Sequence, residues 1–230
     1  MFYYNIYADG TVDFVAEYEV VSSRLRRIGM MMEFNPDLCL TNYYARGPLD
    51  NTVDRKQGAD LGIYYASVPD FHVDYVRPQT SGDRQDLRWI KLFDEEGKGV
   101  MVETEGQVNL TLDNYTDAYK HNYLHQWEMD ASSQIFANFD YLQLGIGNAS
   151  CGAGVLDEYV LPTSGVYSYR LRFSPVENMD TGVISNVDTE EDAASAPVFD
   201  IQGRLVGNSS FSNMLSRGMY VSKGRKFVVK

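Results

Sequence analysis

The sequence has little cysteine and no long apolar run. Two cysteines, Cys39 and Cys151, occur in 230 residues, which excludes a scaffold held by many disulfides, and spacing alone does not pair their sulfurs. No stretch of about 18 consecutive apolar residues is present, so we expect no transmembrane helix. A basic and then apolar leader is also missing, because a strand-like segment follows Met1 at once. These absences favour either a cytosolic protein or a piece of a longer chain.

Positive charge and nucleotide-binding or nucleophile motifs are also scarce. The chain has 20 Lys and Arg against 32 Asp and Glu, a formal net charge of −12. Such a surface repels phosphate backbones and anionic lipids, which disfavours binding to nucleic acid or to an acidic membrane. No Walker loop, CxxC pair, serine nucleophile motif or dinucleotide-binding glycine pattern is present. The function classes that depend on those motifs are therefore not predicted.

Histidine is rare, with three residues in the chain. His121 and His125 are four residues apart, a spacing that could place both on one helix face as metal ligands. Asn122 stands where the HExxH pattern requires glutamate, so surface or packing roles are favoured and we predict no metal site. His72, beside Phe71, has the setting of a structural histidine at a strand edge.

Aromatic and strand-forming residues are abundant instead. Aromatic content is 13%, with 17 tyrosines, which favours strands over a helical bundle. Short strand patterns separated by turns at roughly 8–12-residue spacing predict an all-β, antiparallel β-sandwich. The expected strands are residues 2–8 and 11–21 around a two-residue Asp9-Gly10 turn, then 25–34, 38–44, 61–68, 73–76, 87–93, 99–105, 108–112, 135–146 and 167–173.

The pattern also predicts where the chain departs from a regular sandwich. Residues 25–34 are continuously apolar, which indicates a strand buried on both faces, and only residues 116–124 suggest a helix. Residues 174–196 carry an acidic run, few apolar residues and no period, which is typical of a linker. We therefore predict a sandwich over residues 1–173, a linker over 174–196 and a small C-terminal β unit over 197–230.

A glycine-rich stretch, residues 144–162, is the strongest candidate for a functional loop. It contains Gly145, Gly147, Gly152 and Gly154 between two strand patterns. Glycine permits positive φ and a close approach of the backbone to another group, and a sandwich corner does not need four of them. The stretch predicts a loop that serves a binding site, with a plain inter-strand connection as the alternative.

Two clusters of mixed charge lie between the strand patterns. One joins Arg46 to the loop of residues 50–55, and the other spans residues 77–88. Bidentate arginine–carboxylate pairs are well suited to holding irregular loops against a sandwich. We interpret both clusters as structural, with ligand contact as the alternative.

These clusters also carry a family resemblance. The segments are Arg27-Ile-Gly29, Tyr44-Ala-Arg-Gly-Pro-Leu-Asp-Asn-Thr-Val-Asp-Arg55 and Tyr75-Val-Arg-Pro-Gln-Thr-Ser-Gly-Asp-Arg-Gln-Asp-Leu-Arg-Trp89. They resemble the RIG, YGRGPxENYxDR and YxxPQExGNRxDVRW patterns of the small-chain domain of family 2 glycoside hydrolase beta-galactosidases. The resemblance runs in consistent order from Phe2 to Phe173. It implies a supersandwich fold of the galactose mutarotase-like type.

The glycine loop is similar to the GxGGDDSW segment of the same family. In that family the tryptophan of this segment reaches the active site and stacks on the sugar, whereas this chain has Cys151, which supplies no aromatic face. The resemblance still implies a substrate-binding loop that contains Asn148, Ser150 and Cys151. The other departures from the family patterns are Asp50 for Glu, Thr52 for Tyr, Thr80 for Glu and Asp83 for Asn.

The resemblance implies that the catalytic groups lie elsewhere. In this family the two catalytic glutamates belong to a (β/α)₈ barrel upstream of the small-chain domain, and no βα alternation is present here. We therefore expect no catalytic residue and no cofactor in this chain. The expected partners are the catalytic barrel of a parent enzyme, its beta-galactoside and further copies in a homo-oligomer. Because the resemblance begins part-way into the family's domain, we expect a C-terminal fragment or a split gene product.

The C-terminal residues carry a second resemblance. Residues 198–206 contain the order Asp-x-x-Gly-Arg, and residues 215–230 contain Gly218-Met-Tyr and a final basic strand. Both are similar to a type IX secretion sorting domain, with a generic β-appendage as the alternative. The resemblance implies export to the periplasm or to the cell surface.

The main hypothesis is an accessory domain that supports a beta-galactosidase barrel and lends residues 148–154 to the rim of its sugar site. One alternative is a free-standing sugar-binding or mutarotase-like (aldose epimerase) sandwich. That chemistry needs a positioned general acid and base, for which His72 or His121 with a glutamate are the candidates. Another alternative is a structural fragment that binds no sugar.

Overall fold

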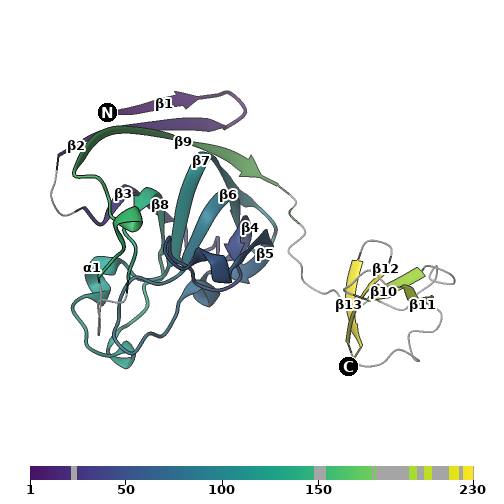
Figure 1. The fold of residues 1–230 in the computed structure, drawn as a ribbon. Coiled ribbons are helices and arrows are strands. Elements are labelled where there is room, and N and C mark those ends of the chain that lie inside the picture. Colours follow the sequence, from purple (N-terminus) through teal and green to yellow (C-terminus); the bar gives the residue numbers. More distant parts are fainter. Residues whose placement is uncertain are drawn as a thin grey trace. The chain divides into compact units, whose positions relative to one another are not determined.

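A computed structural model describes residues 1–21, 25–147, 154–177, 179, 197–200, 205–208, 218–222 and 225–229. The chain forms two compact units, Met1–Thr181 and Gly182–Lys230, drawn in Figure 1. Almost every element is an antiparallel strand, which confirms the predicted all-β class. The described helices are all short, and none is long and apolar enough to cross a membrane. They are α1 (Asp117–Lys120) and the 3-10 turns η1 (Lys56–Gly58), η2 (Val68–Phe71), η3 (Gln126–Glu128) and η4 (Asp157–Tyr159).

The first unit is one curled antiparallel sheet of nine strands. Its order is β1-β2-β9-β7-β6-β4-β5, and β8, with β3 beside it, branches from β7. The strands are β1 (Phe2–Ile6), β2 (Val12–Val21), β3 (Arg27–Phe34), β4 (Leu40–Gly47), β5 (Asp60–Ser67), β6 (Asp83–Phe93), β7 (Gly99–Asp113), β8 (Ile135–Gln143) and β9 (Ser164–Val176). The branch at β7 divides the sheet into two arms.

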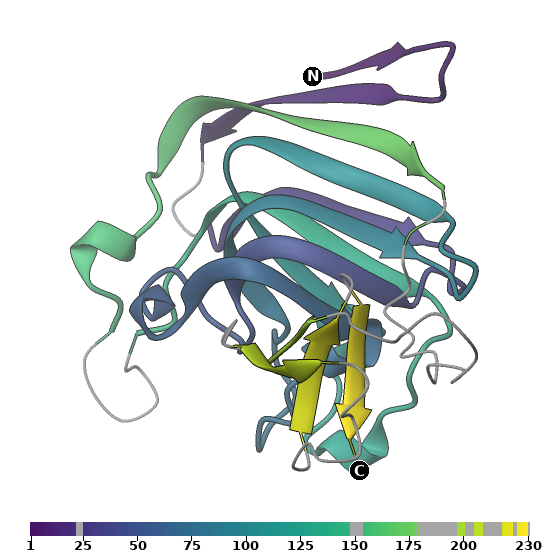
Figure 2. The same ribbon diagram turned by 90° about the vertical axis from the view of Figure 1, so that its right-hand side faces the viewer.

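Strand β7 supports both arms because its two halves pair with different neighbours. Residues 99–105 pair with β9, and residues 109–113 pair with β8. On the other side of β7, β6 pairs with both halves. Gly106 lies between the halves at φ +86°, a conformation that glycine adopts without steric cost. The sequence predicts two strands here, and the structure has a single strand that changes partner near this glycine. Figure 2 shows β9 and β2 curving over the strands below them.

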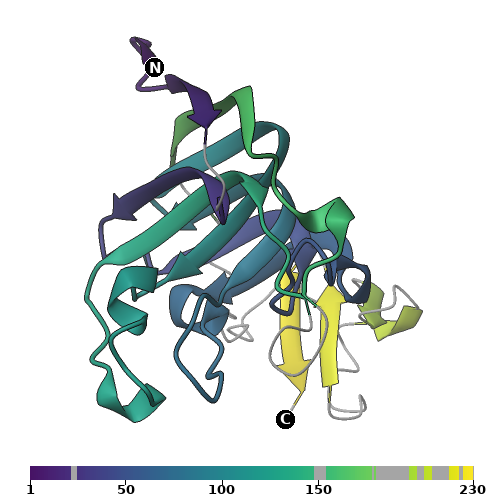
Figure 3. The same ribbon diagram turned by 60° about the vertical axis from the view of Figure 1, so that its left-hand side comes forward.

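The buried core is formed by side chains of β2, β4, β6, β7, β8, β9 and η2. One arm of the sheet contains β1, β2 and β9, and the other contains β3 and β8 (Figure 3). A stack of tyrosines joins the arms: Tyr169 of β9 packs on Tyr18 and on Tyr141, with ring centroids 6.1 and 5.9 Å away. The Tyr18 hydroxyl donates to Gly29 O at 3.1 Å, and the Tyr169 hydroxyl donates to Phe139 O at 3.2 Å. Buried tyrosines thus supply apolar area and satisfy their hydroxyls on the opposite arm.

Several local expectations were wrong. Residues 73–76 form no strand. Residues 25–34 are not buried on both faces, because Met30 and Met32 pack against the core whereas Met31 between them is 55% exposed. The short helix predicted within residues 116–124 is confirmed as α1, which the Thr116 hydroxyl caps, although the chain leaves helical geometry after His121. The first hairpin connects β1 to β2 through residues 7–11 rather than a two-residue turn, with Gly10 at φ +84°.

The second unit is a small antiparallel sheet. Its order is β11-β10-β12-β13, formed by β10 (Pro197–Asp200), β11 (Leu205–Asn208), β12 (Gly218–Ser222) and β13 (Arg225–Val229). Among its described side chains, Val198 and Tyr220 are buried. Strand β9 continues to Val176, and Met179 N donates to Gly97 O at 2.9 Å, so the first unit extends beyond residue 173.

Candidate functional site

The glycine-rich loop is anchored where it leaves β8. Gly145 N donates to Tyr159 O at 3.2 Å, and Gly147 N donates to Asp54 Oδ2 at 2.6 Å. The Arg55 guanidinium donates back to Gly147 O at 2.7 Å. Asp54 and Arg55 are the last two residues of the motif of residues 44–55. Two segments that are distant in sequence therefore meet at the base of this loop.

The base of the loop requires glycine. Gly147 has φ +60°, and a Cβ there would lie 2.9 Å from the carbonyl carbon of Gly154. A Cβ on Gly145 would lie 3.0 Å from Asp54 Oδ2. Gly147 and Gly154 therefore bring the two ends of the loop together. The predicted substrate-binding residues Asn148, Ser150 and Cys151 lie between these ends and outside the described residues.

Asp54 holds this base as a carboxylate. Partial burial opposes ionisation, but hydrogen bonds from the Gly147 amide and from the Thr52 hydroxyl, 2.8 Å from Oδ1, outweigh it and lower the pKa of Asp54. An ionised carboxylate is the stronger acceptor for a backbone N–H. The root of the loop is therefore fixed at neutral pH.

The first charge cluster holds loops together, in line with its structural interpretation. Arg46 was expected to pair within residues 50–55, but it pairs with Asp86 instead. Arg46 Nε contacts Asp86 Oδ2 at 2.5 Å, and Lys56 Nζ lies 3.3 Å from Asp86 Oδ1. Arg46 Nη1 also donates to Ala59 O at 2.9 Å. Asp86 comes from the other cluster, where an irregularity in β6 places it at φ 56° and aims its carboxylate at Arg46. The pair ties the segment that carries η1 to β6.

The second cluster continues this scaffold. Asp50 Oδ1 accepts from Asp83 N at 2.5 Å, and Asp50 Oδ2 accepts from the Tyr75 hydroxyl at 2.6 Å. Burial, with the Asp50 hydrogen bond, raises the pKa of Tyr75 to about 12. The Arg84 guanidinium lies 4.5 Å from the ring centroid of Phe71, and its Nε donates to the Tyr43 hydroxyl at 3.2 Å. The motifs of residues 44–55 and 75–89 are therefore joined in one polar support.

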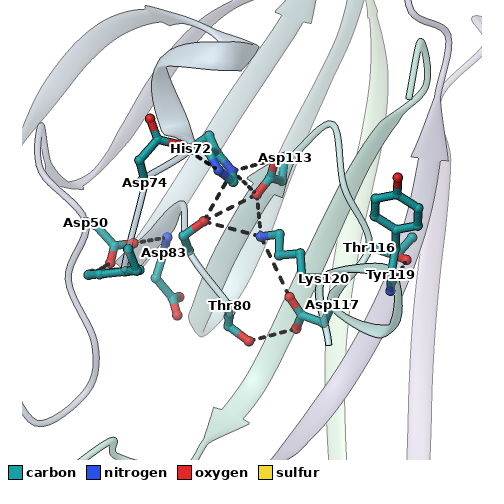
Figure 4. A network of polar contacts seen from close by, with 12 residues as sticks. Asp50, His72, Asp74, Thr80, Asp83, Asp113, Thr116, Asp117, Tyr119 and Lys120 are labelled. Atoms are coloured by element: carbon teal, nitrogen blue, oxygen red, sulfur yellow. Dashed lines mark hydrogen bonds and ion pairs between the residues drawn. The ribbon is translucent and has the colours of Figure 1, made fainter. Parts of the chain in front are cut away.

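A buried network lies beside this support (Figure 4). Lys120 Nζ contacts Asp113 Oδ2 at 2.5 Å and Ser81 Oγ at 3.2 Å. His72 Nδ1 lies 2.9 Å from the same Asp113 oxygen, and Asp117 Oδ1 is 4.0 Å from Lys120 Nζ. The hydrogen bond with Asp113 raises the pKa of His72 although burial opposes it. Strand β7, α1 and the segment before β6 are thereby held together.

This network contains a serine beside a lysine, a pair that some hydrolases use as nucleophile and base. Here Ser81 is 1% exposed and Lys120 is 0% exposed. The lysine ammonium is also engaged by Asp113, which leaves it without a free lone pair for proton abstraction. The network therefore joins the segments that carry Ser81, Asp113 and Lys120 and is closed off from solvent within the described residues.

A second buried carboxylate lies on β8. Asp140 is 1% exposed, and within the described part of the chain neither of its side-chain oxygens has a hydrogen-bond partner; Arg27 Nη1 lies 3.3 Å from Oδ2. Burial raises the pKa of Asp140 to about 7, with Arg27 opposing the rise. Burial also raises the pKa of Asp83 well above its usual range, to which the charge of Asp140 adds. Asp83 and Asp140 thus differ from Asp54, because burial makes both of them harder to ionise.

The structure does not form a histidine site. Lys120 ends α1, so His121 and His125 do not share a helix face; His121 Nδ1 bonds to Asp117 O, and His125 Nδ1 lies 3.3 Å from Glu128 Oε1. Within the described ranges, no three His, Cys, Asp or Glu side chains are placed to hold a metal ion. Neither His72 nor His121 contacts a described glutamate, so the acid–base pair expected for a mutarotase is not assembled there. Cys39 is a free, partly buried thiol.

Comparison with known proteins agrees with this arrangement. Residues 1–173 match the profile of the family described as beta galactosidase small chain. The chain belongs to the beta galactosidase small chain family. The match contains every element of the loop root and of the buried network, so both are parts of a small-chain domain.

Three curated relatives illustrate the relationship. The chain is 28% identical over 177 residues to a beta-galactosidase of Priestia megaterium, which covers 75% of this chain and 17% of that protein. It is 30% identical over 165 residues to a beta-galactosidase of Halalkalibacterium halodurans, covering 69% and 16%. It is 29% identical over 171 residues to a beta-galactosidase of Vibrio cholerae, covering 73% and 16%. The small-chain domain thus spans about a sixth of the length of these relatives.

Sequence reasoning missed the buried charges of this domain. Asp113 comes directly after the strand pattern of residues 108–112, and Lys120 lies in a short polar helix pattern. Charged residues at such positions are expected on the surface. The sequence signal for Asp140 is a lone carboxylate inside the strand pattern of residues 135–146. Such a residue is expected in solvent unless a partner covers it, and here the cover comes from Arg27 and the loops around α1.

Removing the Asp54 carboxylate should loosen the loop root. In Asp54→Ala, the Gly147 amide loses its acceptor, and we expect the free energy of unfolding to fall by about 2 kcal/mol, as for other hydrogen bonds to a charged group. Amide hydrogen exchange of Gly147 should become faster, which NMR would detect. Asp37→Ala, at an exposed position before β4, serves as the control. Unchanged exchange at Gly147 would contradict the proposed anchor.

Proposed function

We propose that this chain is an accessory C-terminal domain of a family 2 beta-galactosidase. It supports the catalytic barrel of the parent enzyme and contributes residues 148–154 to the rim of the site for terminal beta-D-galactosides. Asn148, Ser150 and Cys151 are the proposed sugar contacts. The chain carries no catalytic residue of its own, needs no cofactor, and joins the parent enzyme's homo-oligomer.

The observation that carries this proposal is the anchored root of the loop. A connection without a function needs no second segment to fix it, whereas Asp54 and Arg55 clamp Gly147 from both its N–H and its C=O side. Binding loops gain precision when a rigid scaffold positions their ends. The relatives are all named beta-galactosidase, and the matched region covers about a sixth of each, which supports a catalytic partner outside this chain.

The proposed location is the periplasm or the cell surface. It rests on the type IX sorting-domain resemblance of residues 198–230, where β10 to β13 form a separate small sheet. The test is fractionation of the source bacterium with an antibody against the sandwich. Signal confined to the cytosolic fraction would overturn this part of the proposal.

The parent enzyme, identified from the reading frame upstream, provides the test of the loop. Replacing residues 148–153 with two glycines should raise KM for an aryl beta-galactoside about tenfold, equivalent to about 1.4 kcal/mol of lost binding. Shortening the turn at residues 94–97, between β6 and β7, is the matched control. The 230-residue chain alone should show no turnover. Activity of the purified chain, or an unchanged KM after loop replacement, would contradict the proposed function.

A further inference from the structure

Trp127 occupies a setting that neither the fold nor the proposed rim explains. It lies in η3, the turn between α1 and β8, and is 81% exposed. One face of its indole is covered by the His125 imidazole, with ring centroids 4.2 Å apart and planes 15° from parallel. The uncovered face is therefore presented to solvent.

The turn that carries Trp127 is held in place from both sides. Glu128 Oε2 accepts from Leu124 N and from His125 N, both at 3.0 Å. Gln126 Nε2 donates to Tyr75 O at 2.8 Å, and Gln126 Oε1 lies 3.4 Å from His72 Nε2. The buried network of His72 thus reaches the residue next to Trp127. An exposed aromatic ring on an anchored turn is preorganised, which reduces the entropy cost of binding.

The surroundings of Trp127 favour a sugar over a protein surface. Within residues 121–130, the exposed large apolar side chains are Leu124 and Trp127, so the apolar surface of this turn is little more than the ring itself. His125 stacks on the ring and pairs with Glu128, and the side chains of the two are 44% and 39% exposed. A pyranose offers one face of C–H groups to an aromatic ring and hydroxyls at its edge to polar neighbours. This combination of one aromatic face and a few polar groups is typical of small-ligand recognition.

We propose that Trp127 and His125 form a stacking platform for a pyranose ring, with Glu128 accepting hydrogen bonds from its hydroxyls. The platform is a second saccharide-binding site. In the sequence it precedes β8, whereas the glycine-rich loop follows β8. It serves to hold oligosaccharide or polysaccharide chains that end in galactose. It does not depend on the role of residues 148–154.

The two tryptophans of the chain, Trp89 and Trp127, make the test direct. In Trp89→Phe, Trp127 is the sole indole emitter, and lactose should shift its fluorescence to shorter wavelength with a dissociation constant of about 1 mM or weaker. In Trp127→Phe, the remaining emission of Trp89 should not respond. Affinity electrophoresis in a galactan gel should retard the unmodified chain, and Trp127→Ala should abolish most of that retardation. Tyr4→Ala, an exposed aromatic position on β1, is the matched control and should be retarded like the unmodified chain.

A sugar platform and a protein contact at Trp127 give different results in these measurements. Lack of a spectral response in Trp89→Phe together with equal mobility of the unmodified chain and Trp127→Ala would overturn the platform. A change in sedimentation of Trp127→Ala without any response to sugar would overturn it as well and indicate a protein contact. Gln126→Ala should weaken lactose binding severalfold while the far-ultraviolet spectrum stays unchanged, because the ring remains but its anchor is lost. The KM test of residues 148–153 is independent of all these results.

Discussion

Lys120→Met should lower the free energy of unfolding by about 3–5 kcal/mol, the cost of leaving one partner of a buried ion pair uncompensated. Lys120 is completely buried, and its ammonium contacts Asp113 and Ser81. Methionine matches the length of the aliphatic stem but supplies no donor to either oxygen. Asp113 would then remain buried with His72 and the Ser81 hydroxyl as its partners and no lysine to balance its charge.

Two further variants show whether burial is the cause. Lys98→Met removes a lysine from a close pair with Glu96, whose N–O distance is 2.7 Å but whose side chains are 65% and 72% exposed. Since exposed pairs contribute little, we expect a loss of about 0.5 kcal/mol or less. The double variant Lys120→Met/Asp113→Asn removes both buried charges and should recover part of the loss. Urea unfolding followed by circular dichroism measures all of these values, and equal losses for Lys120→Met and Lys98→Met would refute the argument.

Between about pH 4 and about pH 7, the native chain should lose about 4 kcal/mol of unfolding free energy that the Asp140→Asn variant does not lose. Burial raises the pKa of Asp140 from 3.8 to about 7 in the folded chain. A carboxyl with a raised folded pKa stabilises the fold fully below its unfolded pKa, and this contribution is lost as the pH rises through the folded value. The native chain should therefore lose stability between about pH 4 and about pH 7, because ionisation is resisted in the folded state. Asparagine does not ionise and removes this part of the dependence.

The measured quantity is the difference in unfolding free energy between Asp140→Asn and the native chain at each pH. It should increase in favour of the variant as the pH rises, because titration of groups remote from Asp140 cancels. Asp83 adds to the difference in the same direction, since the charge of Asp140 raises the pKa of Asp83 in the native chain. Asp157→Asn, at an exposed position on η4, should give a difference that does not vary with pH. A flat difference for Asp140→Asn, or a difference of opposite sign, would show that Asp140 is already ionised near pH 4.

The candidate site was only partly predictable from the sequence. The glycines predicted the loop, and the residues around Arg46 predicted its scaffold role, because spacing and residue chemistry act locally. The pairing of Arg46 with Asp86 could not be predicted, since the irregularity in β6 that aims Asp86 depends on how β7 divides between β8 and β9. The platform at Trp127 was missed for a similar reason: its exposure follows from anchors on distant residues, Tyr75 and His72.

Residue patterns alone predicted an all-β chain in which turns separate short antiparallel strands. These two properties follow from side-chain alternation and turn chemistry, which neighbouring residues decide. The small-chain domain was predicted from the resemblance of the long motifs to one family, and the family match over residues 1–173 confirmed it. Only the tertiary structure decided which charges are buried. Lys120 and Asp140 are polar in any sequence pattern, and they lie in the interior because the arms of the sheet and the loops around α1 close over them. Burial depends on contacts between residues far apart in the chain, and no local pattern contains that information.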